Sequence, residues 1–117
     1  MKDINYLKQN GINVESVMDV LGSMEMYDEI LSDFLNGDVL AKLIKYKEAK
    51  DMPNYSIVVH NLKGECLYLG MEKLAHIAFE HQIKSEANDI NYINNNFEIL
   101  TTELRRVITV AKTYLAI

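Results

Sequence analysis

The sequence predicts an all-α protein, an antiparallel up-down-up-down four-helix bundle with a short extra helix at the N-terminal end. Apolar residues recur every three to four positions over long segments, as they do on the buried face of a helix. No segment keeps the strict alternation of apolar and polar residues that marks a half-buried strand. Turn signals divide the chain into long segments joined by short connections, as expected for a bundle.

The first half of the chain predicts two helices. A short helix is expected over residues 14–21, and Asn13 can cap its first turn. A second helix is expected from Ser23 to about Lys50. Glycine weakens a helix interior by up to about 1 kcal/mol. The segment around Gly37 is therefore expected to kink or split this second helix.

Three further helices are expected after residue 50. Asp51 is a suitable N-cap, Pro53 is tolerated in the first turn, and Gly70 suits the left-handed residue that ends a helix. A fourth helix is expected over residues 71–85 and the last over 91–115. The apolar positions that define the last helix are Ile93, Phe97, Leu100, Leu104, Val107, Ile108, Ala111 and Leu115.

Length and composition limit the classes of protein to consider. The 117 residues fit a single domain, residues 1–117, with 49 % apolar and 25 % charged residues. No apolar run is long enough for a membrane span, and we expect no signal peptide. A single cysteine, Cys66, excludes an intrachain disulfide and fits a cytoplasmic location. The net charge of −5, without a lysine and arginine cluster, argues against nucleic-acid binding. We expect no metal site and a monomer.

His60 is the candidate functional residue. With about 100° per residue on a helix, Tyr55, Val59 and Leu62 share one core-facing stripe, and His60 lies about 140° from Tyr55. We therefore expect its imidazole to face solvent. Lys63 and Gly64, three and four residues later, share its face of the helix.

This arrangement is typical of a nucleophilic histidine. A mid-helix glycine is unfavourable, so Gly64 indicates a need for open space beside the imidazole. Lys63 can stabilise a dianion held near the ring. Ser56, Ile57 and Leu67 surround His60 on the helical wheel, and Ile57, Leu67 and Gly64 form a partly open apolar rim on which a partner could dock. A solvent-facing histidine beside a lysine is nevertheless common on helix surfaces.

The segment HNLKGECLYLG, residues 60–70, resembles the signature of histidine-containing phosphotransfer (HPt) domains, roughly H-x-L-K-G-small-small-x-x-apolar-G. The entry segment 11–35 and the residues Asp51, Leu74 and Ala78 are also similar to the family pattern, so the resemblance covers most of the chain.

The resemblance implies a four-helix bundle in which Nε2 of His60 carries a phosphoryl group between aspartates of response-regulator receiver domains. It implies that Lys63 balances the phosphoryl charge, that Gly64 clears the docking surface, and that Gln82 can hydrogen-bond the imidazole. Partners would be receiver domains and possibly a hybrid sensor histidine kinase. The chain would be a phosphocarrier rather than an enzyme and would hold no cofactor, since Mg²⁺ belongs to the receiver.

Some residues depart from the family pattern or have a structural role. Glu65 replaces a small residue but is expected to point away from His60, and Glu86 stands where some members have a cation. His76 is expected to be solvated, and His81 to be hydrogen-bonded and half-buried. Cys66 is expected to be a small apolar core residue rather than a reactive thiol.

Two other functions are considered. A helical adaptor would bind a signalling partner through the surface around Ile57 and Leu67 without phosphate chemistry, and would have no use for Lys63 and Gly64. A kinase dimerisation domain would need a dimerisation hairpin and the glycine-rich boxes of a nucleotide-binding domain, neither of which the sequence has.

Overall fold

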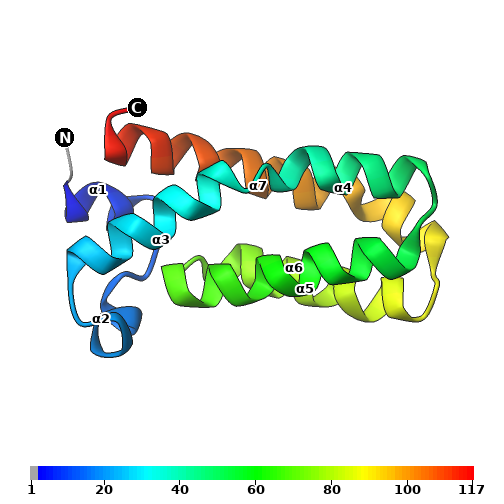
Figure 1. The fold of residues 1–117 in the computed structure, drawn as a ribbon, viewed down its shortest axis with the longest axis horizontal. Helices are drawn as coiled ribbons and strands as arrows, with labels where there is room; N and C mark the ends of the chain where they lie inside the picture. Colours follow the sequence, from blue (N-terminus) through cyan, green and yellow to red (C-terminus); the bar gives the residue numbers. More distant parts are fainter. Residues whose placement is uncertain (1–2) are drawn as a thin grey trace.

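The computed structural model describes residues 3–117 and is helical throughout, with no strand in that range (Figure 1). Within it, seven helices follow one another. They are α1 (Ile4–Gln9), α2 (Glu15–Leu21), α3 (Met24–Asn36), α4 (Val39–Glu48), α5 (Met52–Leu69), α6 (Glu72–Glu86) and α7 (Ile90–Leu115).

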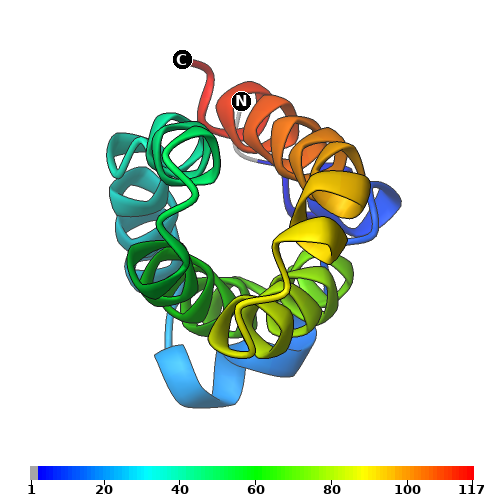
Figure 2. The same cartoon turned by 90° about the vertical axis from the view of Figure 1, so that its right-hand side faces the viewer.

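The long helices lie side by side along the longest dimension of the molecule, and an end-on view shows them arranged around a common centre (Figure 2). α5 packs against α6 and α4, while α7 packs against α6 and α4. The short helices are peripheral, because α1 contacts α7 and α2 contacts α3 and α5. One side of α5 therefore faces α2 rather than another long helix.

The predicted helix boundaries are confirmed where the sequence has strong caps. The side chains of Ser23 and Asp51 accept hydrogen bonds from backbone N–H groups three residues later, at 3.2 Å each. Asn13 Oδ1 likewise accepts from the backbone N–H of Ser16 at 3.2 Å, so it caps α2 as expected. Gly70 ends α5 with a left-handed φ of 73°.

Two features of the N-terminal half differ from, or refine, the expectation. Of the two outcomes expected near Gly37, a kink or a split, the structure has the split, with Asp38 at a φ of 52°, so the second expected helix is the pair α3 and α4. The prediction of only one short helix before them is wrong, because α1 precedes α2. A six-residue helix is unstable alone, and α1 forms because Leu7 is fully buried in the core.

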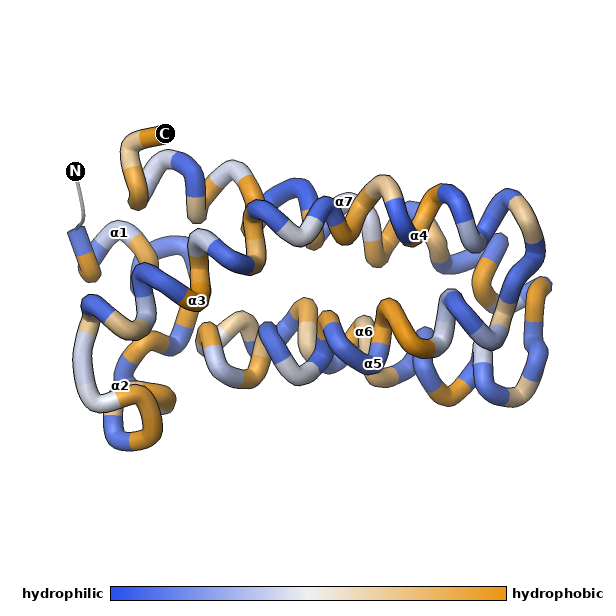
Figure 3. The backbone as a smooth tube through the Cα atoms, viewed as in Figure 1, coloured by the Kyte–Doolittle hydropathy of each residue, from blue (hydrophilic) through white to orange (hydrophobic). Residues whose placement is uncertain are grey.

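The core is one contiguous cluster of buried side chains to which all seven helices of residues 3–117 contribute. Hydrophobic and hydrophilic positions are interspersed along the long helices, as expected for helices that bury one face (Figure 3). No helix in this range is both long and apolar enough to cross a membrane.

The turn between α5 and α6 is fixed to the N-terminal segment. Gly70 accepts a hydrogen bond at its carbonyl from the backbone N–H of Asn13, at 2.9 Å. The hydroxyl of Tyr27 donates to the carbonyl of Leu69 at 2.7 Å inside the core. A side chain at Gly70 would place its Cβ 2.3 Å from the carbonyl oxygen of Asn13. The end of α5 and the start of α2 are therefore held together closely.

Candidate functional site

His60 lies in the middle of α5 and is exposed, as predicted. The rotation of α5 about its axis is set by its buried face. That face consists of Tyr55, Val59, Leu62, Cys66 and Leu69, all fully buried. Because residues on one helix turn by about 100° each, burying this set leaves His60 on the outer side. The position of the imidazole thus follows from packing on the opposite side of the helix.

Lys63 lies one turn from His60 and leans toward α6. Its Nζ is 4.9 Å from the centroid of the Phe79 ring, a cation–π geometry. No carboxylate among residues 3–117 forms an ion pair with it. Among the described residues its positive charge is therefore not neutralised by a carboxylate, and it is held beside the hollow between α5 and α6.

Gly64 is a regular helical residue with open space above it. A Cβ added there would meet no atom within 4 Å, and its φ is not positive. Neither backbone conformation nor packing within residues 3–117 requires glycine here. By contrast, Gly70 needs glycine for both reasons. Glycine at position 64 therefore weakens the helix without a structural need for it among the described residues.

An apolar surface surrounds this part of α5, and we call it the Leu67 surface. The predicted residues Ile57 and Leu67 are 57 % and 56 % exposed. The structure adds Val20 from α2, Tyr68 from α5 and Phe79 from α6, which are also exposed. These three residues were not predicted, although Phe79 was detectable as a large apolar residue on a polar face of its helix.

Two shallow hollows meet at Leu67. One, of about 320 Å³, lies between α2 and α5 and is lined by Val17, Val20, Gly64 and Tyr68, among others. The other, of about 420 Å³, lies between α5 and α6 and is lined by Lys63, Leu67, Ala75, Phe79 and their neighbours. Gly64 lines the first hollow and Lys63 lines the second, so these two predicted site residues lie on either side of Leu67.

Ser56, the other predicted contact residue, is partly buried. Its Oγ donates a hydrogen bond to the carbonyl of Pro53 at 2.8 Å, one turn earlier in α5. Its hydroxyl is therefore used within the helix, and the structure does not bring it into the Leu67 surface.

Gln82 lies on α6 near the level of His60. Lys63 on α5 contacts Phe79 on α6, and Leu67 shares a hollow with Ala75. The two helices run antiparallel, so equal steps in opposite directions along the chain stay level. His60, three residues before Lys63, is therefore level with Gln82, three residues after Phe79. No hydrogen bond joins these two side chains, and the buried Oε1 of Gln82 has no partner within residues 3–117.

The remaining histidines have the structural roles that were expected, with one difference. His76 is exposed, and its Nε2 lies 3.2 Å from Glu80. His81 is fully buried rather than half-buried, at 1 % exposure, because it lies between α5 and α7. Its Nδ1 is hydrogen-bonded to the hydroxyl of Tyr55 at 2.8 Å, and burial lowers the pKa of His81 to about 4.

Cys66 and Glu65 also lie where they were expected. Cys66 is fully buried, and this burial raises the pKa of its thiol, so it is a core residue and not a reactive one. Burial also raises the pKa of Glu65, whose charged neighbours are Lys42 on α4 and Asp33 on α3. Glu65 therefore lies on the side of α5 away from α6 and does not obstruct His60.

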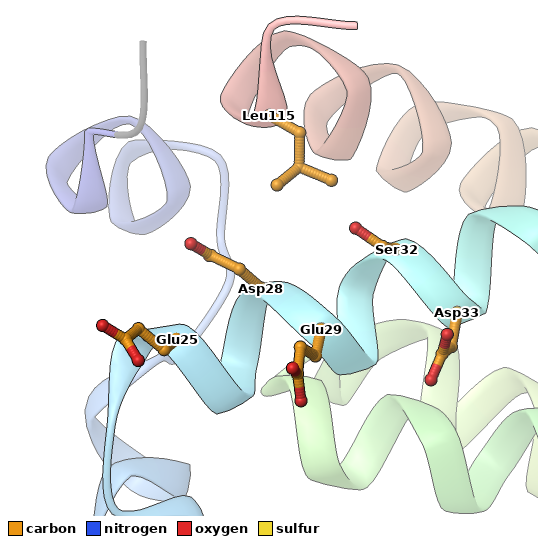
Figure 4. Close-up of a pocket in the computed structure, with 6 residues that line it drawn as sticks. All are labelled: Glu25, Asp28, Glu29, Ser32, Asp33 and Leu115. Atoms are coloured by element: carbon orange, nitrogen blue, oxygen red, sulfur yellow. The ribbon is translucent and has the colours of Figure 1, made fainter.

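A larger hollow lies elsewhere, between α3 and the end of α7 (Figure 4). It measures about 600 Å³, and its lining residues are Glu25, Asp28, Glu29, Ser32, Asp33 and Leu115. Four carboxylates repel an anion, so this hollow does not suit phosphate. Among residues 3–117, no group of three or more His, Cys, Asp or Glu residues is arranged to hold a metal ion.

The chain matches no protein-family model, no curated protein and no solved structure.

Proposed function

We propose that this protein is a histidine phosphotransfer protein of a two-component phosphorelay, with His60 as the phosphoacceptor. The observation that carries the proposal is the exposed imidazole of His60. Beside it lie a lysine that pairs with no carboxylate among residues 3–117 and a glycine that no contact in that range requires. In this proposal α3 and α4 together occupy one of the four helix positions. With α5, α6 and α7 they form an up-down-up-down four-helix bundle.

The proposed reaction is a reversible transfer between a receiver aspartate and His60. The Nε2 lone pair attacks the phosphorus of an aspartyl phosphate, the P–N bond forms, and the P–O bond to the aspartate breaks. The aspartate leaves as a carboxylate. Phosphoryl transfer depends mainly on alignment and charge neutralisation, which exposure of His60 and the Lys63 ammonium can supply. Mg²⁺ would be bound by the receiver, and the chain needs no kinase or phosphatase activity of its own.

The proposed receiver-docking surface is the Leu67 surface together with Gly64. Exposed apolar residues gathered around one functional side chain mark an interaction site. The missing side chain at Gly64 would let the backbone of α5 approach the receiver closely enough for in-line transfer.

An adaptor without phosphate chemistry is the second candidate, and the Leu67 surface favours it because apolar contacts alone can bind a partner. Such an adaptor would still bind its partner with glutamine at position 60. It would not explain an unpaired Lys63 or a glycine at position 64.

The test is transfer of labelled phosphate from a panel of receiver domains charged with acetyl phosphate in the presence of Mg²⁺. We expect an acid-labile, base-stable phosphate on the wild-type protein and none on His60→Gln. Lys63→Ala should slow transfer, whereas Lys73→Ala should not, because Lys73 lines the groove between α6 and α7. Absence of transfer from every receiver, with the variants folded, would favour the adaptor.

A further inference from the structure

We propose that Glu86 is a positioning residue that sets the orientation of the Gln82 side-chain amide and thereby selects Nε2 of His60 as the nucleophile. This inference rests on the proposed function for its biological meaning. Its physical content, the position of a proton on His60, is independent of any partner protein.

Glu86 determines which end of the Gln82 amide faces it. Nε2 of Gln82 donates to Oε2 of Glu86 at 3.4 Å, one turn later in α6. An ionised carboxylate can only accept hydrogen bonds. If the amide were flipped, its oxygen would face the carboxylate and the two would repel. Glu86 therefore turns the amide nitrogen toward itself and the amide oxygen away.

The amide oxygen is left as a buried acceptor. Oε1 of Gln82 has no access to solvent and no donor among the side chains of residues 3–117. A buried acceptor without a donor is unfavourable, so this atom favours any donor that can reach it. His81, its neighbour in α6, is already engaged, because its Nδ1 is bonded to Tyr55 and its ring also hydrogen-bonds the backbone of Asn96.

His60 is the side chain placed to supply that donor. The antiparallel register fixed by Lys63 and Phe79 puts His60 level with Gln82 on the adjacent helix. His60 is exposed, so its ring can change rotamer on a fast timescale. A rotation that brings its Nδ1–H to Oε1 would satisfy the buried acceptor.

The hydrogen bond would fix the tautomer of His60. Histidine in water prefers its proton on Nε2, which would leave that nitrogen unable to attack. A bond from Nδ1–H to Gln82 holds the proton on Nδ1 and leaves the Nε2 lone pair free and pointing outward. Glu86 contributes through Gln82, without touching the reacting atoms.

The test is imidazole ¹⁵N NMR at a pH where His60 is neutral, with its signals assigned by comparison with His60→Gln. We expect mainly the Nδ1–H tautomer in the wild-type protein. Gln82→Ala should lower the ratio of Nδ1–H to Nε2–H by about fivefold, the effect of losing one neutral hydrogen bond. Glu86→Ala should lower the same ratio by up to that amount, because the Gln82 amide is then free to adopt either orientation. Glu80→Gln is the matched control, because Glu80 lies on the same helix but contacts His76.

A second readout is the isomer formed when phosphoramidate phosphorylates His60, followed by ³¹P NMR. Wild type should give the Nε2 isomer and Glu86→Ala a mixture of isomers. An unchanged tautomer ratio and isomer in Glu86→Ala, with helicity retained, would overturn the assignment. Neither measurement uses a receiver. If no receiver transfers phosphate but Glu86→Ala changes the tautomer ratio as expected, only the phosphorelay function is rejected. If receivers do transfer phosphate but Glu86→Ala leaves the ratio unchanged, only the role of Glu86 is rejected.

Discussion

Replacing Gly64 by alanine should stabilise the protein while impairing its proposed function. The residue is in the interior of α5, its φ is not positive, and a Cβ there would touch nothing within 4 Å. Alanine therefore gains helix propensity without a steric cost. It would also place a methyl group on the surface where a partner is proposed to approach His60.

The expected gain is close to the full difference between glycine and alanine in a helix interior, about 1 kcal/mol. Part of it arises in the unfolded chain, where alanine has fewer conformations to lose. For a domain of this size, that corresponds to a rise in melting temperature of about 3–5 °C. Transfer from a receiver should fall by about tenfold to hundredfold, since a displacement near 1 Å disturbs in-line attack by that amount.

Urea and thermal unfolding followed by circular dichroism would measure the stability, and the receiver assay the transfer. Gly70→Ala is the matched control, with the opposite expectation. Its φ of 73° is unfavourable for alanine, and its Cβ would lie 2.3 Å from the carbonyl oxygen of Asn13. We expect a loss of about 2–3 kcal/mol or more. Destabilisation by Gly64→Ala would refute the reading of position 64 as open space, and unchanged transfer would refute its role in docking.

Three further predictions concern stability. The pKa of His81 is lowered to about 4 by burial, so the unfolded state binds more protons below pH 6.5 and stability falls as the pH drops from 6.5 toward 4. In urea titrations, His81→Gln should reduce the pH dependence of the free energy of unfolding by up to about 1.4 kcal/mol per pH unit. An unchanged pH dependence would contradict the prediction. Tyr27→Phe should lower the free energy of unfolding by about 1–3 kcal/mol, because the buried carbonyl of Leu69 loses its hydrogen-bond donor. Tyr68→Phe, at an exposed position, should have little effect in the same assay. Asp51→Ala should cost about 1 kcal/mol by loss of the α5 cap, and Asp51→Asn should largely retain stability.

The helices with strong local signals could be predicted from the sequence. Asp51, Pro53 and Gly70 define α5 through short-range chemistry, namely a capping side chain, a fixed φ and a left-handed C-terminal residue. The 3.6-residue period then places Tyr55 inward and His60 outward. Helix α1 could not be predicted in this way, because six residues do not form a stable helix alone and it depends on burying Leu7 against distant segments.

The sequence by itself determined the class of fold, the exposure of His60 and the presence of Lys63 and Gly64 on the same face, because these depend on periodicity within one helix. Tertiary structure decided what lies beside that face. It brought Val20 and Phe79 to the Leu67 surface, buried His81 against Tyr55, and left Gln82 Oε1 buried without a partner among residues 3–117. These facts depend on which helices pack together and in what register, and the side chains that meet across helices are far apart in the chain.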